Sequence, residues 1–168
     1  MRALIVGAGG VGGNLAARLA AAYAGEHEIC LLARGTHATR IRERGLELRQ
    51  PARTVIGHPT VVERFPDVHG IELAVLAVKD PALDGILPEL ANTLAANSWV
   101  LPLLNGLPRA DAVSTRLPTA RLFEGCIYVA SRRVGPGIIG QQSPFCRVVL
   151  QGAFEVGRRR RGRSVRLP

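Results

Sequence analysis

The chain has 168 residues, of which 47% are hydrophobic and 21% are charged, a balance that suits one packed domain and excludes a disordered chain. The formal net charge is +9, but six arginines lie between positions 158 and 166, and the first 156 residues carry 16 basic and 13 acidic side chains. The charge of the folded part therefore does not indicate a nucleic acid partner.

The first part of the chain predicts alternating strands and helices. A short apolar run at residues 3–6 ends in glycine, which is typical of a buried strand, and residues 10–24 place apolar side chains four positions apart on one helical face. Residues 28–33 predict a second buried strand. Residues 36–44 predict a helix that ends before Gly45.

The rest of the chain continues this alternation after an irregular stretch at residues 46–72, where we expect short strands and connections. Buried strands are predicted at residues 73–78, 99–104, 121–129 and 146–150, with helices at residues 80–94 and 108–116 and a turn at residues 135–137. Pro88 is expected to kink or split the first of these helices. Apolar strands that alternate with helices predict right-handed βαβ units. The expected fold class is therefore α/β, with a Rossmann-type, doubly wound, mostly parallel sheet and helices on both faces.

The cysteines and the apolar segments exclude several kinds of site. Cys30, Cys126 and Cys146 lack the paired spacing of a metal or disulfide framework, so we expect no bound metal. Cys30 and Cys126 lie in apolar runs, where a reduced cysteine behaves as a small hydrophobic residue. No apolar stretch is long enough to span a bilayer, so we expect no membrane partner and a cytoplasmic location.

One glycine-rich loop carries the clearest chemical signal. It consists of Gly7, Ala8, Gly9, Gly10, Val11 and Gly12, and it reads G-x-G-x-x-G between a predicted strand and a predicted helix. In this pattern the first glycine permits a tight turn, the second lets the backbone approach a pyrophosphate, and the third lets the helix pack on the sheet. The helix N-terminus also offers free N–H groups to phosphates. The loop therefore predicts a dinucleotide-binding domain over residues 1–156, with a glycine-rich turn that binds no nucleotide as the alternative.

The end of the second predicted strand indicates which dinucleotide binds. Sites for NAD usually place an acidic residue about 20 residues past the loop, where it bonds the ribose 2′-hydroxyl. This chain has Arg34 at that place and no acid. The planar guanidinium of Arg34 could pair with the 2′-phosphate of NADP, so we expect NADP (NADPH) as the cofactor. A solvent-exposed arginine without a ligand is the alternative.

Two polar residues follow later strands of the predicted sheet. Lys79, the only lysine in the chain, follows the strand at residues 73–78, and Asn105 follows the strand at residues 99–104. Ligands of open parallel sheets bind beyond the carboxyl ends of the strands, so we expect both side chains to line the same cleft. A solvated charge and an Asn-Gly turn are the respective alternatives.

Together these motifs resemble those of the ketopantoate reductases (2-dehydropantoate 2-reductases) over about residues 1–150. The resemblance rests on the glycine loop, LLARG at residues 31–35, AVK at 77–79, LLNG at 103–106 and EGCIYVASRRVGPG at 124–137. It implies NADPH-dependent reduction of 2-dehydropantoate to pantoate in pantothenate biosynthesis. It also implies that the loop and Arg34 hold the cofactor phosphates, that Lys79 and Asn105 lie near the nicotinamide and its ribose, and that Ser131 contacts the cofactor.

The resemblance further implies a C-terminal helical domain that this sequence does not contain. In the family that domain carries the general-acid lysine and most substrate contacts, so the catalytic residues of this chain are unknown. We therefore expect the cofactor-binding part of a truncated 2-keto-acid reductase, whose exposed interdomain face could self-associate or bind a partner. The alternatives are a non-catalytic NADP(H)-binding module and a reductase of another 2-keto acid. The arginine-rich tail at residues 157–168 is expected to be disordered, without specific nucleic acid recognition.

Overall fold

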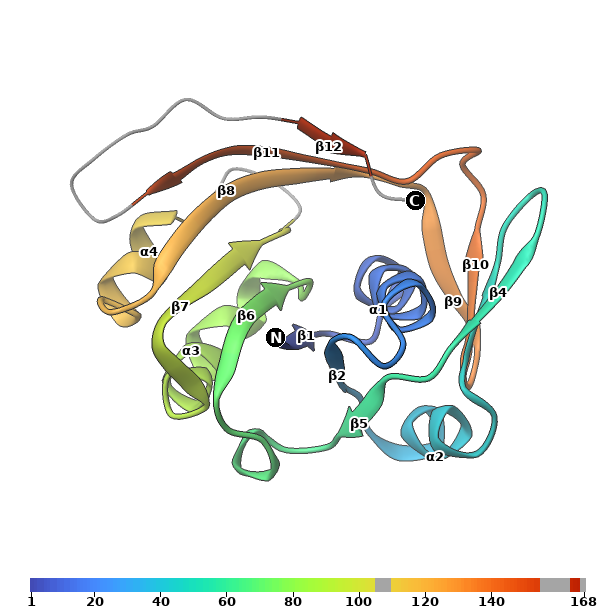
Figure 1. Cartoon of the computed structure of the whole chain (residues 1–168), viewed down its shortest axis with the longest axis horizontal. Coiled ribbons are helices and arrows are strands. Elements are labelled where there is room, and N and C mark those ends of the chain that lie inside the picture. The colour runs from blue at the N-terminus through green and yellow to red at the C-terminus, as the bar shows by residue number, and fades with distance from the viewer. Residues whose placement is uncertain (105–109, 155–163, 167–168) are drawn as a thin grey trace.

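The computed structural model describes residues 1–104, 110–154 and 164–166. Its larger sheet has eight strands in the order β12-β11-β8-β7-β6-β1-β2-β5 (Figure 1). Six of these strands run parallel to one another: β1 (Arg2–Val6), β2 (Glu28–Leu32), β5 (Thr60–Val62), β6 (Ile71–Leu76), β7 (Leu94–Pro102) and β8 (Arg121–Tyr128). This arrangement confirms the expected α/β class with a mostly parallel sheet.

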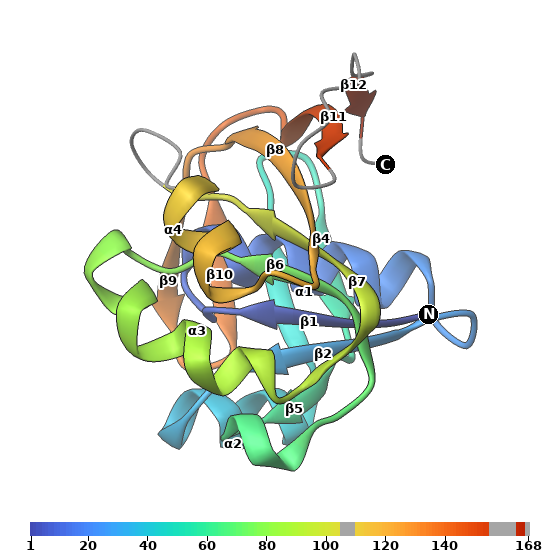
Figure 2. The same cartoon turned by 90° about the vertical axis from the view of Figure 1, so that its left-hand side faces the viewer.

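The order of the strands reverses at β1, which pairs with β2 on one side and with β6 on the other. Val6 at the end of β1 is opposite Leu32 in β2 and Leu76 in β6, so the three strands end at one level. Figure 2 shows the arrows of these strands pointing the same way. A reversal of this kind opens a crevice beyond the carboxyl ends of the strands, which is where doubly wound sheets bind their ligands.

Helices cover both faces of the larger sheet, as expected. One face carries α1 (Gly10–Ala22) and α2 (Gly35–Arg44), and the other carries α3 (Leu83–Ala91) and α4 (Ala110–Arg116). Alternate residues of β1 face opposite sides of the larger sheet. Ile5 packs in the core with α1, and Leu4 packs in the core with α3. Both side chains are fully buried, which explains why β1 is a continuous apolar run.

A second sheet lies on the outer side of α1 (Figure 1). Its strands follow the order β4 (Thr54–Gly57), β3 (Leu46–Arg49), β10 (Ile138–Gln141) and β9 (Ser131–Gly135). The short strands expected within residues 46–72 and the turn at residues 135–137 are confirmed, but β9 and β10 are not among the predicted strands. β10 pairs in parallel with β3, and Ile138 lies opposite Glu47. This pairing joins distant parts of the chain, so it leaves no local pattern in the sequence.

The single helix expected over residues 80–94 is divided differently. A 3-10 helix, η2 (Asp80–Ala82), precedes α3, and Leu94 already belongs to β7. Pro88 lies inside α3 with its side chain exposed, and α3 continues past it to Ala91. A second 3-10 helix, η1 (Phe65–Asp67), buries Phe65 in the core that contains α3.

The C-terminal part of the larger sheet is antiparallel. β11 (Arg147–Phe154) pairs with β8, and β12 (Ser164–Arg166) pairs with β11, both in antiparallel fashion. The tail at residues 157–168 was expected to be disordered, but residues 164–166 form a strand because they complete backbone hydrogen bonds along β11. The other residues of the tail lie outside the described part of the chain.

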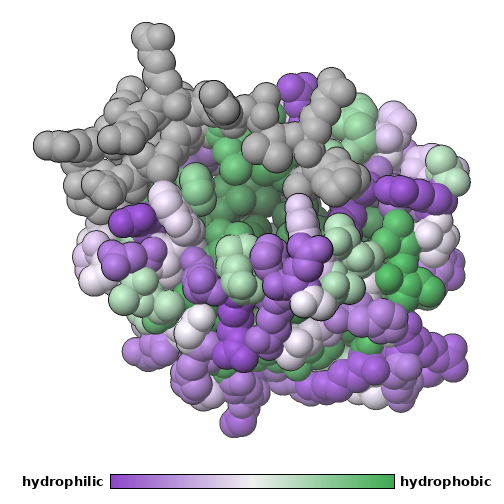
Figure 3. All heavy atoms as spheres, in the orientation of Figure 1, coloured by the Kyte–Doolittle hydropathy of each residue, from purple (hydrophilic) through white to green (hydrophobic). Residues whose placement is uncertain are grey.

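The two cysteines of the apolar runs differ in exposure. Cys30 is fully buried, whereas Cys126 is exposed on the same side of β8 as the exposed Tyr128. Figure 3 shows the face on which the parallel strands begin, with hydrophilic residues over its lower part and hydrophobic atoms in its upper middle. The carboxyl ends of the strands lie on the opposite face.

Among the described helices, none has the length and apolar composition needed to cross a membrane.

A buried polar network fixes α1 against the second sheet. Asn14 is fully buried, and its Nδ2 donates to Oε1 of Gln141 at 2.9 Å. Arg18, one turn further along α1, donates to Oδ1 of Asn14 at 3.0 Å, to Oε1 of Gln141 at 2.9 Å and to Oε1 of Gln50 at 3.1 Å. Buried polar groups are costly without partners, so this network favours one position of α1 relative to β10.

We expect the second sheet to contribute strongly to stability. Ile139 is fully buried, and a Cβ added at Gly13 of α1 would lie 2.6 Å from its Cδ1. Ile139→Ala should therefore lower the free energy of unfolding by about 2–5 kcal/mol, as measured by urea denaturation. The neighbouring Ile138 is only half-buried, so Ile138→Ala is the matched control and should cost less. Equal losses in the two variants would contradict a core position for the second sheet.

Candidate functional site

The glycine loop follows β1 and turns directly into α1. Gly7 has a φ of 111°, which favours glycine, and a Cβ at this position would lie 2.6 Å from the carbonyl oxygen of Ala77. A Cβ at Gly12 would overlap the carbonyl oxygen of Gly7 and approach the Cβ of Ala77 at 3.1 Å. These two glycines therefore let α1 start close to the ends of β1 and β6. Both positions bear out the expected tight turn and the expected close packing of helix on sheet.

Gly9 plays a different part, because a side chain there would meet nothing within 4 Å. It is the N-cap residue of α1, it makes no side-chain capping bond, and the first turn contains no acid. The first N–H groups of α1 and the positive end of its dipole are thus not neutralised by a cap from the chain. Open space beside uncapped N–H groups is the arrangement that a phosphate group requires.

Gly10 is needed for a contact that the sequence does not reveal. A Cβ at Gly10 would overlap the backbone carbonyl of Ser131, the first residue of β9, and would lie 2.9 Å from the Cα of Arg132. The second sheet therefore reaches the N-terminus of α1 and forms a wall beside the glycine loop. Glycine at this position lets β9 approach the helix N-terminus.

These elements enclose a cleft of about 1040 Å³ at the carboxyl ends of β1, β2 and β6. Nearly all of the predicted cofactor-binding residues line it: Gly7, Ala8, Gly9, Gly10, Val11, Arg34, Lys79 and Ser131. Gly12 lies behind the loop and shapes it from within. Asn105 lies outside the described residues. The structure thus brings together residues from the first strand–helix unit, from the end of β2, from the end of β6 and from β9.

Arg34 stands at the entrance of the cleft as the N-cap residue of α2. Its side chain is exposed, and its Nε donates to the backbone carbonyl of Glu63 at 3.0 Å. No other hydrogen bond of this guanidinium is found within the described residues, so its terminal nitrogens remain available. The carboxylate of this same Glu63 is paired with Arg42 at 2.6 Å, so its negative charge is already compensated.

Lys79 and Ser131 line the cleft from different elements, the end of β6 and the start of β9. Lys79 lies after β6 with its side chain exposed, and its carbonyl accepts from the N–H of Ala82 at 3.0 Å at the start of η2. The Oγ of Ser131 is buried and has no hydrogen-bond partner within the described part of the chain. An unpartnered hydroxyl on a cleft wall can donate to a ligand or accept from one.

Among the polar residues that line the cleft, sequence reasoning missed His37, Glu89, Arg132 and Arg133. Arg132 and Arg133 lie on β9, and neither has an ion-pair partner among the described residues. His37 lies in the first turn of α2 and is 3% exposed. Burial is the main cause that lowers the pKa of His37. The charge of Arg133 lowers that pKa further, and the backbone of Ala8 opposes both. The one feature of the sequence that could have indicated Arg132 and Arg133 was the pair of adjacent arginines in VASRRVG at residues 129–135.

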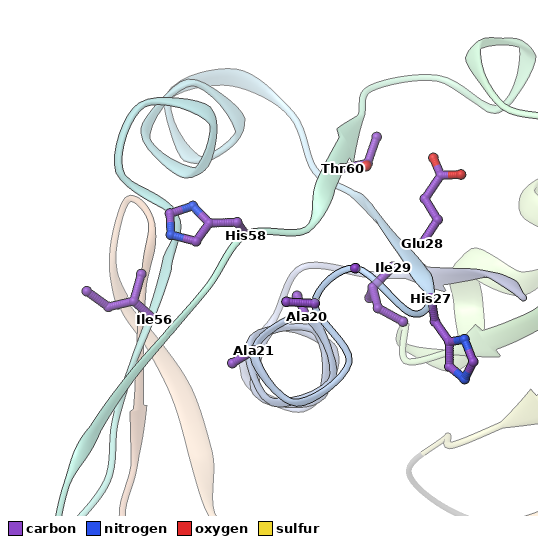
Figure 4. Close-up of a pocket in the computed structure, with 10 residues that line it drawn as sticks. Ala20, Ala21, His27, Glu28, Ile29, Ile56, His58 and Thr60 are labelled. Carbon is purple, nitrogen blue, oxygen red and sulfur yellow. The ribbon is translucent and has the colours of Figure 1, made fainter.

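A second hollow of about 400 Å³ lies at the opposite end of the strands, between the end of α1 and β5. Figure 4 shows its two imidazoles, His27 and His58, on opposite sides of α1. Within the described residues, no three potential metal ligands come together.

A comparison with protein families shows which family the chain belongs to. Residues 3–157 match the model of the family described as ketopantoate reductase PanE/ApbA. The chain belongs to this family. Membership in the ketopantoate reductase family implies a pyridine nucleotide cofactor, which agrees with the glycine loop and the strand order of the larger sheet.

Three relatives illustrate the similarity. The chain is 32% identical to the 2-dehydropantoate 2-reductase of Mesorhizobium japonicum over 159 residues, which cover 83% of this chain and 48% of that protein. It superposes on the crystal structure of 2-dehydropantoate 2-reductase from Porphyromonas gingivalis with a TM-score of 0.79 and 30% identity, covering 90% of this chain and 54% of that one. A PanE/ApbA family ketopantoate reductase from Ralstonia eutropha gives a TM-score of 0.80 at 26% identity, covering 90% and 49%. The chain thus spans about half the length of these relatives.

The different surroundings of Gly9 and Gly10 lead to a first prediction for the site. Gly10→Ala should destabilise the chain by about 1–3 kcal/mol, because its methyl group would collide with the backbone of β9. Gly9→Ala is the matched control and should leave the melting temperature nearly unchanged, because its methyl group enters open space at a φ of −82°. Thermal unfolding followed by circular dichroism measures both, and a larger loss in Gly9→Ala would refute the wall formed by β9.

The lowered pKa of His37 leads to a second prediction. The unfolded chain binds a proton at the ordinary histidine pKa of about 6.5, whereas folded His37 resists protonation, so acidification below that value favours unfolding. The melting temperature should therefore fall between pH 7 and pH 5, and the fall should be smaller in His37→Asn. His58→Asn, at an exposed histidine, is the control and should keep the fall of the unmodified chain. A fall of the same size in His37→Asn would show that His37 does not contribute.

Proposed function

We propose that this chain binds NADPH in the main cleft and forms the cofactor-binding part of a reductase that converts 2-dehydropantoate to pantoate. The observation that carries this proposal is the position of Arg34 at one end of the same cleft that contains the glycine loop. In folds of this type the residue that contacts the ribose 2′-position follows the second strand of the first strand–helix–strand unit, which is where Arg34 lies. Membership in the ketopantoate reductase family supports the reaction and its place in pantothenate biosynthesis, in the cytoplasm.

The residues of the cleft fit such a cofactor in shape. A volume of about 1040 Å³ accommodates a large ligand, and the open space at Gly9 lets a pyrophosphate reach the first N–H groups of α1. The buried Oγ of Ser131 is an unpaired polar group that a bound cofactor would satisfy. Ser131 lies directly beside Gly10 of the glycine loop, and both line the same cleft.

The charges near Arg34 favour a phosphorylated ribose over an unmodified one. A site for NAD needs a free carboxylate to accept from the ribose 2′-hydroxyl. The carboxylate of Glu63 is already bound to Arg42, and the terminal nitrogens of Arg34 are available for a 2′-phosphate. A planar guanidinium can bind a phosphate with two parallel hydrogen bonds, which a hydroxyl cannot match.

The reaction requires a hydride, which NADPH supplies when it is bound. The residues of this chain bind and orient the cofactor: the glycine loop holds the pyrophosphate, Arg34 holds the 2′-phosphate, and Lys79 and Ser131 contact the nicotinamide and its ribose. The family resemblance assigns Asn105 to the same role. The charge that develops on the ketone oxygen needs a proton donor within hydrogen-bond reach, a contribution of about 10²–10⁴-fold in rate. We assign no residue of this chain to that step, because Lys79 follows β6 on the ribose side of the cleft.

Arg34→Ala tests the proposed cofactor. The unmodified chain should bind NADPH at least about tenfold more tightly than NADH, because a charge-assisted pair contributes about 1.5–3 kcal/mol. Arg34→Ala should remove most of this preference and leave the affinity for NADH nearly unchanged. Titration followed by the fluorescence of the reduced nicotinamide gives both dissociation constants.

Arg40→Ala is the matched control for that experiment. Arg40 lies on the exposed side of α2, where it pairs with Glu43 at 3.0 Å, and it does not line the cleft. Its removal should leave the preference for NADPH intact. Equal affinity of the unmodified chain for NADPH and NADH would overturn the assignment of Arg34.

A further inference from the structure

His37 is a buried polar residue on the wall of the main cleft. It belongs to the first turn of α2, three residues after Arg34, and only 3% of its surface is exposed. Its Nδ1 lies 2.8 Å from the backbone N–H of Gly137, in the turn between β9 and β10. This N–H can only donate, so Nδ1 accepts and the neutral ring carries its proton on Nε2.

The Nε2 atom has no hydrogen-bond partner within the described part of the chain. A buried donor without an acceptor is rare in proteins and disfavours the folded state, so each instance calls for a missing partner. The ring lines the main cleft, where an acceptor on a ligand could meet Nε2. The turn at Gly137 fixes the ring in the orientation that presents this donor.

The groups around His37 indicate what kind of acceptor fits. The backbone of Ala8 in the glycine loop is close enough to the ring to act as a weak acceptor that raises the pKa of His37, but it makes no hydrogen bond of normal geometry with Nε2. Arg133 of β9 is close enough for its charge to act on the imidazole. Arg34, three residues earlier, follows β2 and lines the same cleft. These groups surround the part of the cleft nearest to β2, which holds the adenosine half of a dinucleotide in this fold. Two cations and a neutral donor favour an anion that carries phosphate oxygens.

We propose that His37 is a cofactor-binding residue that donates its Nε2–H to a phosphate oxygen on the adenosine half of NADPH. This inference rests on the proposed function and extends it from Arg34 to α2 and the second sheet. A neutral donor suits the position, because a third cation would repel Arg34 and Arg133 whenever the cleft is empty. Burial and the charge of Arg133, which both lower the pKa of His37, keep the ring in this neutral form.

Two amide substitutions separate the two nitrogens of the ring. In His37→Asn the side-chain oxygen can take the place of Nδ1 and still accept from Gly137, but no donor reaches the place of Nε2. In His37→Gln the longer amide can place a donor near Nε2, while the acceptor for Gly137 is displaced. Binding and stability should therefore respond in opposite ways to the two substitutions.

The probes are adenosine 2′,5′-bisphosphate and adenosine 5′-monophosphate, titrated by calorimetry into the full 168-residue chain. His37→Asn should bind the bisphosphate about tenfold more weakly than the unmodified chain and keep a similar melting temperature. His37→Gln should retain more of the affinity and lose more of the thermal stability. A loss for the bisphosphate alone assigns the contact to the 2′-phosphate, and a loss for both probes assigns it to the 5′-phosphate; either result supports the proposal.

His27→Asn is the matched control, because His27 lies in the hollow at the opposite end of the strands. It should bind both probes like the unmodified chain. The proposal is overturned if His37→Asn binds both probes as tightly as the unmodified chain, or if it loses nicotinamide mononucleotide affinity to the same extent, which would indicate a general distortion of the cleft. An unmodified chain that binds neither adenosine probe would instead contradict the proposed function itself.

Discussion

The close contact between the start of α1 and its surroundings is the constraint on which the site depends. The helix is held between two sheets, and glycine is present wherever a Cβ would collide: Gly12 against Gly7, Gly10 against Ser131, and Gly13 against Ile139. These contacts fix the direction of the helix as well as its position. The uncapped N–H groups therefore point into the space beyond the strands, where a phosphate can be bound without any cationic side chain.

The parts of this arrangement that the sequence predicts are those encoded by neighbouring residues. The apolar run of β1, the glycine loop and the amphipathic start of α1 form one continuous segment. The pattern of apolar residues and the spacing of the glycines were therefore sufficient to predict this strand–loop–helix unit. The parallel pairing of β10 with β3 joins Ile138 to Glu47 across most of the chain, and no local periodicity reports it. For the same reason the sequence does not reveal that Ser131 lies against Gly10. His37 was missed because it lies in a helix rich in polar residues, where an inward-facing imidazole looks like another solvated side chain.

The second sheet changes the electrostatics of the cleft as well as its shape. In a strand–helix–strand unit alone, the positive charge beside the phosphates would come from the dipole of α1 and from Arg34. Here β9 adds Arg132 and Arg133 on the facing wall. The carboxylate of Glu63, whose backbone carbonyl accepts from Arg34, is paired with Arg42. Among the described residues that line the cleft, Arg34, Lys79, Arg132 and Arg133 are cationic and Glu89 is acidic. The positive charge is therefore gathered in the cleft, although the first 156 residues together are only slightly basic.

A cleft that binds phosphate with several cationic side chains also needs neutral hydrogen-bond donors. Each further cation would raise the repulsion within the empty cleft, and long charged side chains lose conformational freedom when they bind. Ser131 and His37 can supply hydrogen bonds without charge, because their buried Oγ and Nε2 atoms have no partner within the described residues. The ring of His37 is fixed by Gly137, a residue of the second sheet's hairpin. The sheet that clamps α1 thus also orients the side chain that completes the phosphate-binding wall, so the packing of the helix and the chemistry of the cleft depend on the same strands.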